Sequence, residues 1–189
     1  VKSKKVKITP KNFEKIYFSW LKNIRDWNIS RQLWWGHQLP VWFHESKCVP
    51  IKGREQDIKH CKEIIVSINK PVCQFCSGKF IQSEDVLDTW FSSALWPFAG
   101  LSKKDVKEFY PSAVLITARD IINLWVARMI FSGLEFMKKE PFPETLIHAT
   151  ILTKEGKRMS KSLGTGIDPL ELIEKYGADA TRFGIIWQT

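Results

Sequence analysis

Apolar residues near the N-terminus recur at the spacing of an α-helix. They stand three and four positions apart between Asn12 and Ile24, and Pro10 lies just before this segment. This spacing gathers them on one side of a helix, so residues 12–24 predict an amphipathic helix that starts after the proline. The apolar side consists of Phe13, Ile16, Tyr17, Trp20, Leu21 and Ile24.

The second half of the chain alternates short apolar runs with longer helical segments. AVLIT (113–117) and TLIHATIL (145–152) are candidate buried strands. The segment 120–139 between them starts at Asp120 and is apolar on most of its circumference, which predicts a helix packed on both sides. The order strand, helix, strand predicts an α/β fold, a parallel sheet with covering helices.

A helix with clear end signals follows the second strand. Asp168 suits the N-cap, Pro169 suits the first helical position, and Gly177 marks the end. A further helix begins near Asp179. Because ligands of open α/β sheets lie at the carboxyl ends of the strands, the loop between strand and helix is a candidate binding site.

That loop has the sequence GKRMSKSLG, residues 156–164, with three cations and two hydroxyls between glycines. Cations this close repel one another unless an anion neutralises them, and a phosphate chain can also accept hydrogen bonds from hydroxyls and backbone N–H groups. The glycines allow the loop to close on a ligand. The loop lacks the glycine spacing of a Walker loop. Composition alone favours a solvated basic turn.

The composition describes a folded, basic protein. The chain has 189 residues, 44% of them hydrophobic, a net charge of +9 and an isoelectric point near 9.4. Such a charge favours a polyanionic partner, although ordinary solvating lysines also explain it. No apolar run approaches the roughly 18 residues of a membrane span, and no apolar core follows the basic start, so we expect a cytoplasmic protein with reduced thiols.

All four cysteines lie between residues 43 and 83, which predicts a small zinc-ribbon-like insert. Cys73 and Cys76 form a C-x-x-C pair followed by Ser77-Gly78, as in a zinc knuckle. His44 and Cys48 complete a closed four-ligand set, for which Cys61 or His60 is a rival. A closed set has no open coordination position, so a bound Zn²⁺ would be structural. Four reduced cysteines in a loop are the alternative.

Several long strings resemble one enzyme family. RMSKS (158–162) resembles the KMSKS signature of class I aminoacyl-tRNA synthetases and stands where that family has it, after a strand and before a helix. WNISRQLWWGHQLPVW, EDVLDTWFSSALWPF and RDIINLWVARMIFSGLEF resemble the valyl-tRNA synthetases in the same order. Isoleucyl-tRNA synthetases usually have Asp at the position of Ser92 and lack LWWGH; they remain the nearest alternative.

The resemblance implies an ATP-dependent reaction. Family members join L-valine to ATP, with Mg²⁺, and pass the valyl group to tRNA(Val). Lys161 matches the second lysine of the signature, which binds the ATP phosphates as the transition state forms. Arg158 replaces the first lysine, keeping the charge with a planar fork, and is the second catalytic candidate. Met159 and Ser160 would lie beside the adenine and phosphates.

The resemblance also implies the remaining site residues. Trp90, Ile121 and Trp125 match the wall of the valine pocket, although without the resemblance ordinary core packing is the simpler explanation for the two tryptophans. His148 would lie near the adenosine, and Asp120 would face the substrate or cap its helix. The family usually has glycine at Ala118 and often at Ala149, where the nucleotide approaches the backbone, so the two added methyl groups depart from the family pattern.

The matched strings cover only part of such a synthetase. The HIGH signature, the editing domain and the anticodon-binding domain have no counterpart here, so we expect a partial catalytic domain that is inactive alone and part of a monomeric enzyme. Its divisions are a helical, Trp-rich connector (1–42), the cysteine-containing insert (43–83) and the second half of a Rossmann-like domain (84–189). A non-enzymatic RNA-binding protein with a zinc knuckle is the alternative from another class.

Overall fold

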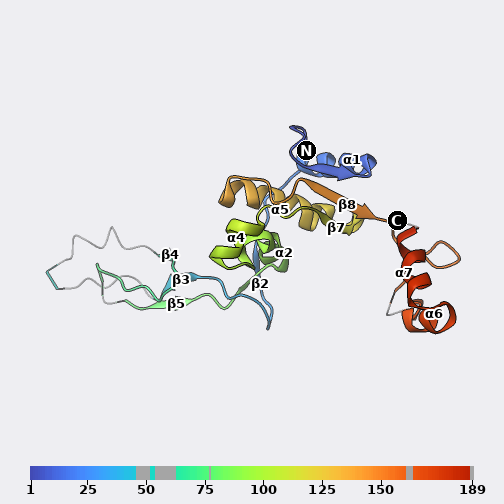
Figure 1. Ribbon diagram of the computed structural model, residues 1–189. Helices are drawn as coiled ribbons and strands as arrows, with labels where there is room; N and C mark the ends of the chain where they lie inside the picture. Colours follow the sequence, from blue (N-terminus) through green and yellow to red (C-terminus); the bar gives the residue numbers. More distant parts are fainter. Residues whose placement is uncertain (46–51, 54–62, 77, 161–163, 188–189) are drawn as a thin grey trace. The chain divides into compact units, whose positions relative to one another are not determined.

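The computed structural model in Figure 1 describes residues 1–45, 52–53, 63–76, 78–160 and 164–187. The chain divides into two compact units. The first consists of Val1–Arg25 and Ser93–Thr189, and the second consists of Asp26–Ser92. The predicted divisions after residues 42 and 83 stay predictions.

The first unit contains a three-stranded parallel sheet in the order β1-β8-β7. Strands β7 (Leu115–Ala118) and β8 (Glu144–His148) confirm the two predicted strands. The second one is shorter than predicted, because Leu152 forms an isolated antiparallel bridge with Arg158 instead of extending the strand. The expected α/β fold with a parallel sheet is confirmed.

Strand β1 (Lys7–Thr9) lies in the segment that the sequence analysis treated only as a basic start. Its Ile8 is almost fully buried, while Lys7 points to solvent. Lys7 Nζ and Thr9 Oγ1 donate to Glu144 Oε1 over 2.8 and 2.9 Å. These bonds, first that of Lys7 and then that of Thr9, lower the pKa of Glu144, so its charged form is favoured in the fold.

Helix α1 (Glu14–Lys22) follows the short 3₁₀ helix η1 (Lys11–Phe13) and confirms the predicted amphipathic helix. Its Tyr17 is buried in the core of the unit, where burial raises the pKa of the phenol. The core joins side chains from both ends of the chain: Val6, Ile8, Tyr17, Ile122, Val126, Ala127, Met129, Ile130, Phe142 and Ile147.

The predicted helix 120–139 is a chain of short helical pieces. It consists of η3 (Arg119–Ile121), the π-helix η4 (Ile122–Val126), α5 (Ala127–Ser132) and the π-helix η5 (Gly133–Met137). The expectation that it packs on both sides is wrong for the described residues. One side is buried in the core, but four large apolar side chains are exposed: Leu124, Phe131, Leu134 and Phe136.

Helices α6 (Pro169–Tyr176) and α7 (Ala178–Trp187) confirm the predicted C-terminal helices. The Asp168 carboxylate accepts a hydrogen bond of 2.9 Å from the Leu170 N–H and so caps α6. Gly177 follows at φ +86°, a value that favours glycine. The short helices α3 (Trp96–Ala99) and α4 (Lys103–Phe109) complete this unit.

The second unit is built from two small antiparallel sheets. Strand β2 (Ser30–Arg31) pairs with β6 (Val86–Leu87). Strand β3 (Val41–His44) lies between β4 (Ile64–Val66) and β5 (Phe80–Gln82). Helix α2 (Thr89–Ala94) runs across the division between the units. Within the described residues, no helix has the length and apolar character needed to cross a membrane.

Candidate functional site

The carboxyl ends of β7 and β8 meet at one edge of the parallel sheet. Ala118 and His148, the last residues of the two strands, are partners in the register. Asp120 lies in η3, directly after β7. Parallel pairing therefore brings two of the predicted nucleotide-binding positions, Asp120 and His148, to the same edge, as expected for a site of this fold class.

The basic loop begins as a tight turn after β8. The Thr153 N–H donates to the Lys157 carbonyl over 2.8 Å, and the Gly156 N–H donates to the Thr153 carbonyl over 2.9 Å. Gly156 has φ +74°, which a residue with a side chain rarely adopts. This turn reverses the chain so that Arg158 lies beside Leu152.

The reversal brings Arg158 to Asp120, with which its guanidinium forms an ion pair. The two residues are 38 positions apart in the sequence, and both side chains are exposed. Two predicted ATP-binding residues are therefore in contact. A phosphate group entering this edge would compete with the Asp120 carboxylate for Arg158, because both anions bind the same planar donor fork.

The rest of the signature is only partly described. The Ser160 N–H donates to Thr165 Oγ1 over 2.9 Å, and the Thr165 N–H donates to the Ser160 carbonyl over 3.2 Å. Met159 and Ser160 are half-buried. Lys161, the first catalytic candidate, lies outside the described residues.

One ring nitrogen of His148 contacts a backbone carbonyl. Its Nδ1 lies 2.8 Å from the Ala149 carbonyl oxygen, so this nitrogen carries the hydrogen and donates it. In the neutral ring Nε2 is then an acceptor. The half-buried imidazole therefore offers the carboxyl edge of the sheet an acceptor for a hydroxyl or an amino group.

The predicted valine-pocket residues are distributed over both units. Trp125 lies in η4, packs against the core and donates from Nε1 to the Ser93 carbonyl over 2.9 Å. Ile121 ends η3, four positions earlier. Trp90 belongs to the second unit, so the structure brings only Ile121 and Trp125 into one unit.

The backbone at Trp90 is held by an acidic residue that the sequence analysis did not single out. Asp88 is buried, forms an ion pair with Arg31 and accepts a hydrogen bond of 2.7 Å from the Trp90 N–H through Oδ1. Arg31 also donates to the carbonyls of Asn28 and Ser30, each over 2.7 Å. Arg31 and Asp88 both lie in sequence segments that resemble the family, and this position could have identified them as candidates.

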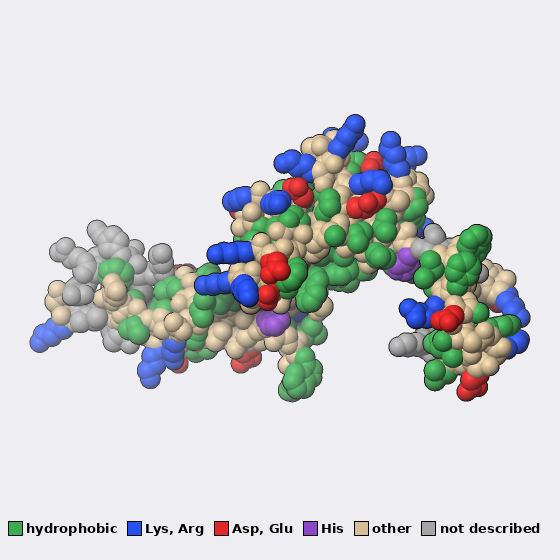
Figure 2. Space-filling view, viewed as in Figure 1, with side chains coloured by type: hydrophobic (Ala, Val, Ile, Leu, Met, Phe, Trp, Pro, Cys, Tyr) green, Lys and Arg blue, Asp and Glu red, His purple; other side chains and the backbone are tan. Residues whose placement is uncertain are grey.

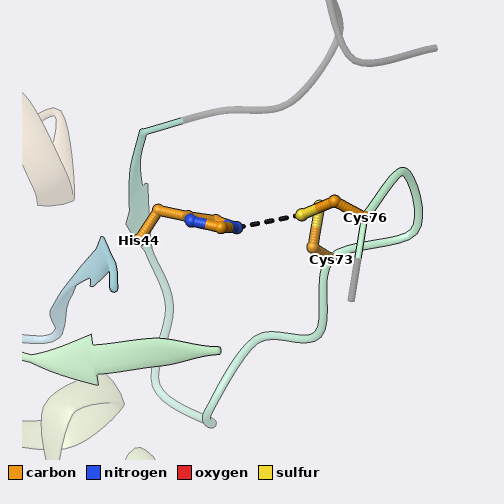
Figure 3. A group of neighbouring side chains, drawn as sticks. All are labelled: His44, Cys73 and Cys76. Atoms are coloured by element: carbon orange, nitrogen blue, oxygen red, sulfur yellow. Dashed lines mark hydrogen bonds between the residues drawn. The ribbon is translucent and has the colours of Figure 1, made fainter. Parts of the chain in front are cut away.

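Three of the predicted metal ligands lie together in the second unit. His44 at the end of β3 points toward Cys73 and Cys76, which precede β5 (Figure 3). One imidazole nitrogen and the two sulfurs lie within 4.8 Å of one another, and His44 Nε2 is 3.0 Å from Cys76 Sγ. Cys48 and its rivals His60 and Cys61 lie outside the described residues.

The surroundings of the cluster suit a metal. The Gly78 N–H donates to Cys76 Sγ over 3.4 Å, and a sulfur that accepts backbone N–H bonds is better able to carry thiolate charge. The Phe80 and His44 rings pack edge to face with their centroids 5.0 Å apart, which restricts rotation of the imidazole. Ligands of tetrahedral Zn²⁺ with bonds of ~2.1–2.3 Å lie about 3.6 Å apart, so only small movements separate this arrangement from a bound site.

Curated relatives match almost the whole chain. The valine--tRNA ligase of Clostridium tetani is 54% identical over 98% of this chain, and that of Carboxydothermus hydrogenoformans is 52% identical over 96%. The Bacillus subtilis enzyme of the same name is 48% identical over 96%. The chain spans only about a fifth of the length of these relatives.

Solved structures and a family model agree with these relatives. The chain superposes on the LeuRS of Agrobacterium radiobacter K84, in a complex with tRNA and LeuAMS, with a TM-score of 0.63 and 20% identity over 95% of this chain and 28% of that one. Methionyl-tRNA synthetase of Mycobacterium tuberculosis, bound by methionyl-adenylate, gives 0.60 with 19% identity over the same shares. These likenesses show the fold. The family model described as tRNA synthetases class I (I, L, M and V) matches residues 1–189, and the chain therefore belongs to this family.

Proposed function

We propose that this chain forms the second half of the nucleotide-binding catalytic domain of a valine--tRNA ligase. The full enzyme would ligate L-valine to tRNA(Val) through valyl-adenylate. The observation that carries the proposal is the contact between Arg158 of the KMSKS-like loop and Asp120 at the carboxyl edge of the sheet. The valine assignment is supported by the three relatives of that name, at 48–54% identity.

Adenylate formation defines what these residues must do. An oxygen of the valine carboxylate attacks the α-phosphorus of ATP, and the bond from this phosphorus to the bridging oxygen breaks, so magnesium pyrophosphate leaves with the electron pair. Negative charge grows on the leaving oxygens, and Lys161 and Arg158 would stabilise it. Arg158 would exchange the Asp120 carboxylate for a phosphate oxygen, so the loop closes as the nucleotide binds.

The remaining residues would position the two small substrates. His148 would accept a hydrogen bond from the adenosine through Nε2, with Met159 and Ser160 beside the adenine and phosphates. Asp120, once released by Arg158, would accept one from the ribose or the valine ammonium. Trp90, Ile121 and Trp125 would form the dry wall that a β-branched aliphatic side chain needs.

The cysteine cluster would hold a structural Zn²⁺. His44, Cys73 and Cys76 would supply three ligands, and Cys48 the fourth, with Cys61 or His60 as its rival. The site would tie β3 to the segment before β5 and have no part in the chemistry, because a closed four-ligand set leaves no position for a substrate. The close approach of the three described ligand atoms supports the interpretation of this insert as zinc-ribbon-like.

Amino-acid-dependent exchange of pyrophosphate into ATP tests the proposal, in the complete protein that contains this segment. Valine should support exchange far better than isoleucine, and Arg158→Gln should slow it. Lys157→Gln is the matched control, because it removes the same charge from the same loop outside the signature. Preference for isoleucine would favour the isoleucyl alternative, and binding of RNA without any exchange would favour the RNA-binding one. The 189-residue chain alone should be inactive.

A further inference from the structure

Positive charge is concentrated at the start of the chain. Residues 1–25 contain eight of the 29 lysines and arginines but only one of the 20 acidic residues, Glu14. Eight cations and one anion give this segment a charge of +7, against +9 for all 189 residues. The family signature plays no part in this excess, since the KMSKS-like loop lies at the other end of the chain.

The folded segment displays part of this charge on one side of a helix. Tyr17 of α1 is buried in the core, and the opposite side of α1 and η1 lines an open hollow of about 630 Å³. Its lining consists of Lys11, Asn12, Glu14, Lys15, Phe18, Ser19 and Lys22. Blue side chains stand over this part of the molecule in Figure 2, at the top of the view.

These lysines are not neutralised within the fold. All three of Lys11, Lys15 and Lys22 are exposed, and none of them forms an ion pair with any residue that the structure describes. By contrast, Lys7 on β1 is paired with Glu144. The lining of the hollow therefore carries three lysines against one carboxylate, Glu14, and so a net positive charge.

The arrangement fits a chain of phosphates. Lys11 and Lys22 are eleven residues apart, which is about 16 Å along a helix and covers several phosphates of one nucleic-acid strand. Phe18 lies between them and is half-buried, with Lys2 Nζ 5.9 Å from its ring centroid. Its ring gives the hollow an apolar floor for a ribose or base, which a purely electrostatic patch would lack.

We propose that this α1 face, consisting of Lys11, Lys15, Phe18 and Lys22, binds the sugar–phosphate backbone of tRNA. The proposal rests on the function proposed above, which supplies tRNA as the polyanion. The contact is independent of base sequence, because lysines on phosphates carry no base readout. It therefore contributes affinity and orientation, and leaves the choice between tRNA species to other parts of the enzyme.

The test compares two triple variants of the complete protein. K11Q/K15Q/K22Q removes three charges from the α1 face. K103Q/K104Q/K107Q removes three exposed lysines from α4, where Asp105 and Glu108 balance most of the charge. Binding of a tRNA(Val) transcript is measured from 50 to 300 mM salt. The slope of the logarithm of the association constant against the logarithm of the salt concentration counts the neutralised phosphates. If each lysine neutralises one phosphate, K11Q/K15Q/K22Q should lower the magnitude of this slope by about 2 to 3 and weaken binding about 50- to 150-fold at 0.15 M salt.

Each outcome decides the proposal. The α4 triple should keep the wild-type slope; an unchanged slope in the α1 triple, or equal losses in both triples, would overturn it. Loss of binding to phosphatidylserine vesicles but not to tRNA would assign the face to a membrane instead. Valine-dependent pyrophosphate exchange needs no tRNA and is measured on the wild-type protein, so its absence would refute the proposed function separately from the tRNA contact.

Discussion

Gly78→Ala is the sharpest probe of the candidate metal cluster. A Cβ atom at this position would lie 2.0 Å from His44 Cε1 and 2.4 Å from His44 Nε2. Ordinary carbon–carbon contact begins near 3.4 Å, so the ring must retreat by about 1.4 Å or the chain must shift. Because Nε2 is the atom that approaches Cys76 Sγ, the added methyl group acts directly on a proposed zinc bond.

The expected loss is large because two effects add. Displacement of a ligand by more than an ångström removes most of one coordination bond, and disturbance of a metal's outer contacts alone typically costs 10- to 100-fold in affinity. Overpacking costs about 1–3 kcal/mol in addition. We therefore expect Zn²⁺ to bind Gly78→Ala at least ~100-fold more weakly than the wild type.

The assay is competition for Zn²⁺ with a chromophoric chelator, with metal content by mass spectrometry as a check. Gly184→Ala is the matched control, because nothing lies within 4 Å of its added Cβ and its φ is not positive. It adds the same methyl group to α7, far from the cluster in sequence. Wild-type zinc affinity and stoichiometry in Gly78→Ala would refute the argument that His44 is a ligand in the position described.

Three further predictions concern the first unit. Asp120→Asn removes the partner of Arg158, so the KM for ATP should change while Zn²⁺ content stays the same; an unchanged exchange reaction across all ATP concentrations would contradict the role of the pair. Burial, and then the Glu140 carboxylate, raise the pKa of Tyr110 to about 12. In the unfolded chain the Tyr110 hydroxyl loses its proton near pH 10, so the free energy of unfolding should fall between pH 10 and 12. The fall should be less steep in Tyr110→Phe. This variant should also be about 1 kcal/mol less stable, because it lacks the hydrogen bond from the Tyr110 hydroxyl to the Lys139 carbonyl. Because the pKa of Glu144 is lowered in the fold, its carboxylate stabilises the fold above pH 4.5, and this stabilisation is lost as the pH falls through the lowered pKa. In Glu144→Gln the free energy of unfolding, measured with urea, should therefore fall less steeply with decreasing pH. A fall as steep as that of the wild type would contradict this.

Local signals in the sequence predicted the elements that depend on local interactions. Asp168 and Pro169 predicted the start of α6, because capping depends only on neighbouring residues. The spacing of apolar residues around Tyr17 predicted α1, because the periodicity of apolar residues directly identifies one face of a helix. Strand β1 was missed because three residues, of which only Ile8 is apolar, are too few to show an alternating pattern, and its pairing with β8 is set by a partner far along the chain.

The site divides in the same way. The cations of the KMSKS-like loop could be recognised from the sequence, whereas the ion pair of Arg158 with Asp120 depends on a turn that reverses the chain after β8. His44 could be proposed as a ligand from its residue type and its place directly after PVWF (40–43). Its closeness to Gly78, which leaves no room for a side chain there, follows only from the packing of β3 against the segment before β5.

The pairing of β1 with β8 has a consequence for synthesis on the ribosome. Lys7 and Glu144 are 137 residues apart, and at about 5–20 residues per second the first strand waits roughly 7 to 27 s for its neighbour. During that time β8, the strand that pairs with β1 in the described sheet, has not been made, and neither have Ile122, Met129 and Ile147 of the core around Ile8. Charged residues at an open strand edge discourage pairing with another chain, so the lysines around β1 would reduce such pairing during synthesis. The same basic segment that suits a nucleic acid in the finished fold would protect the unfinished one from aggregation.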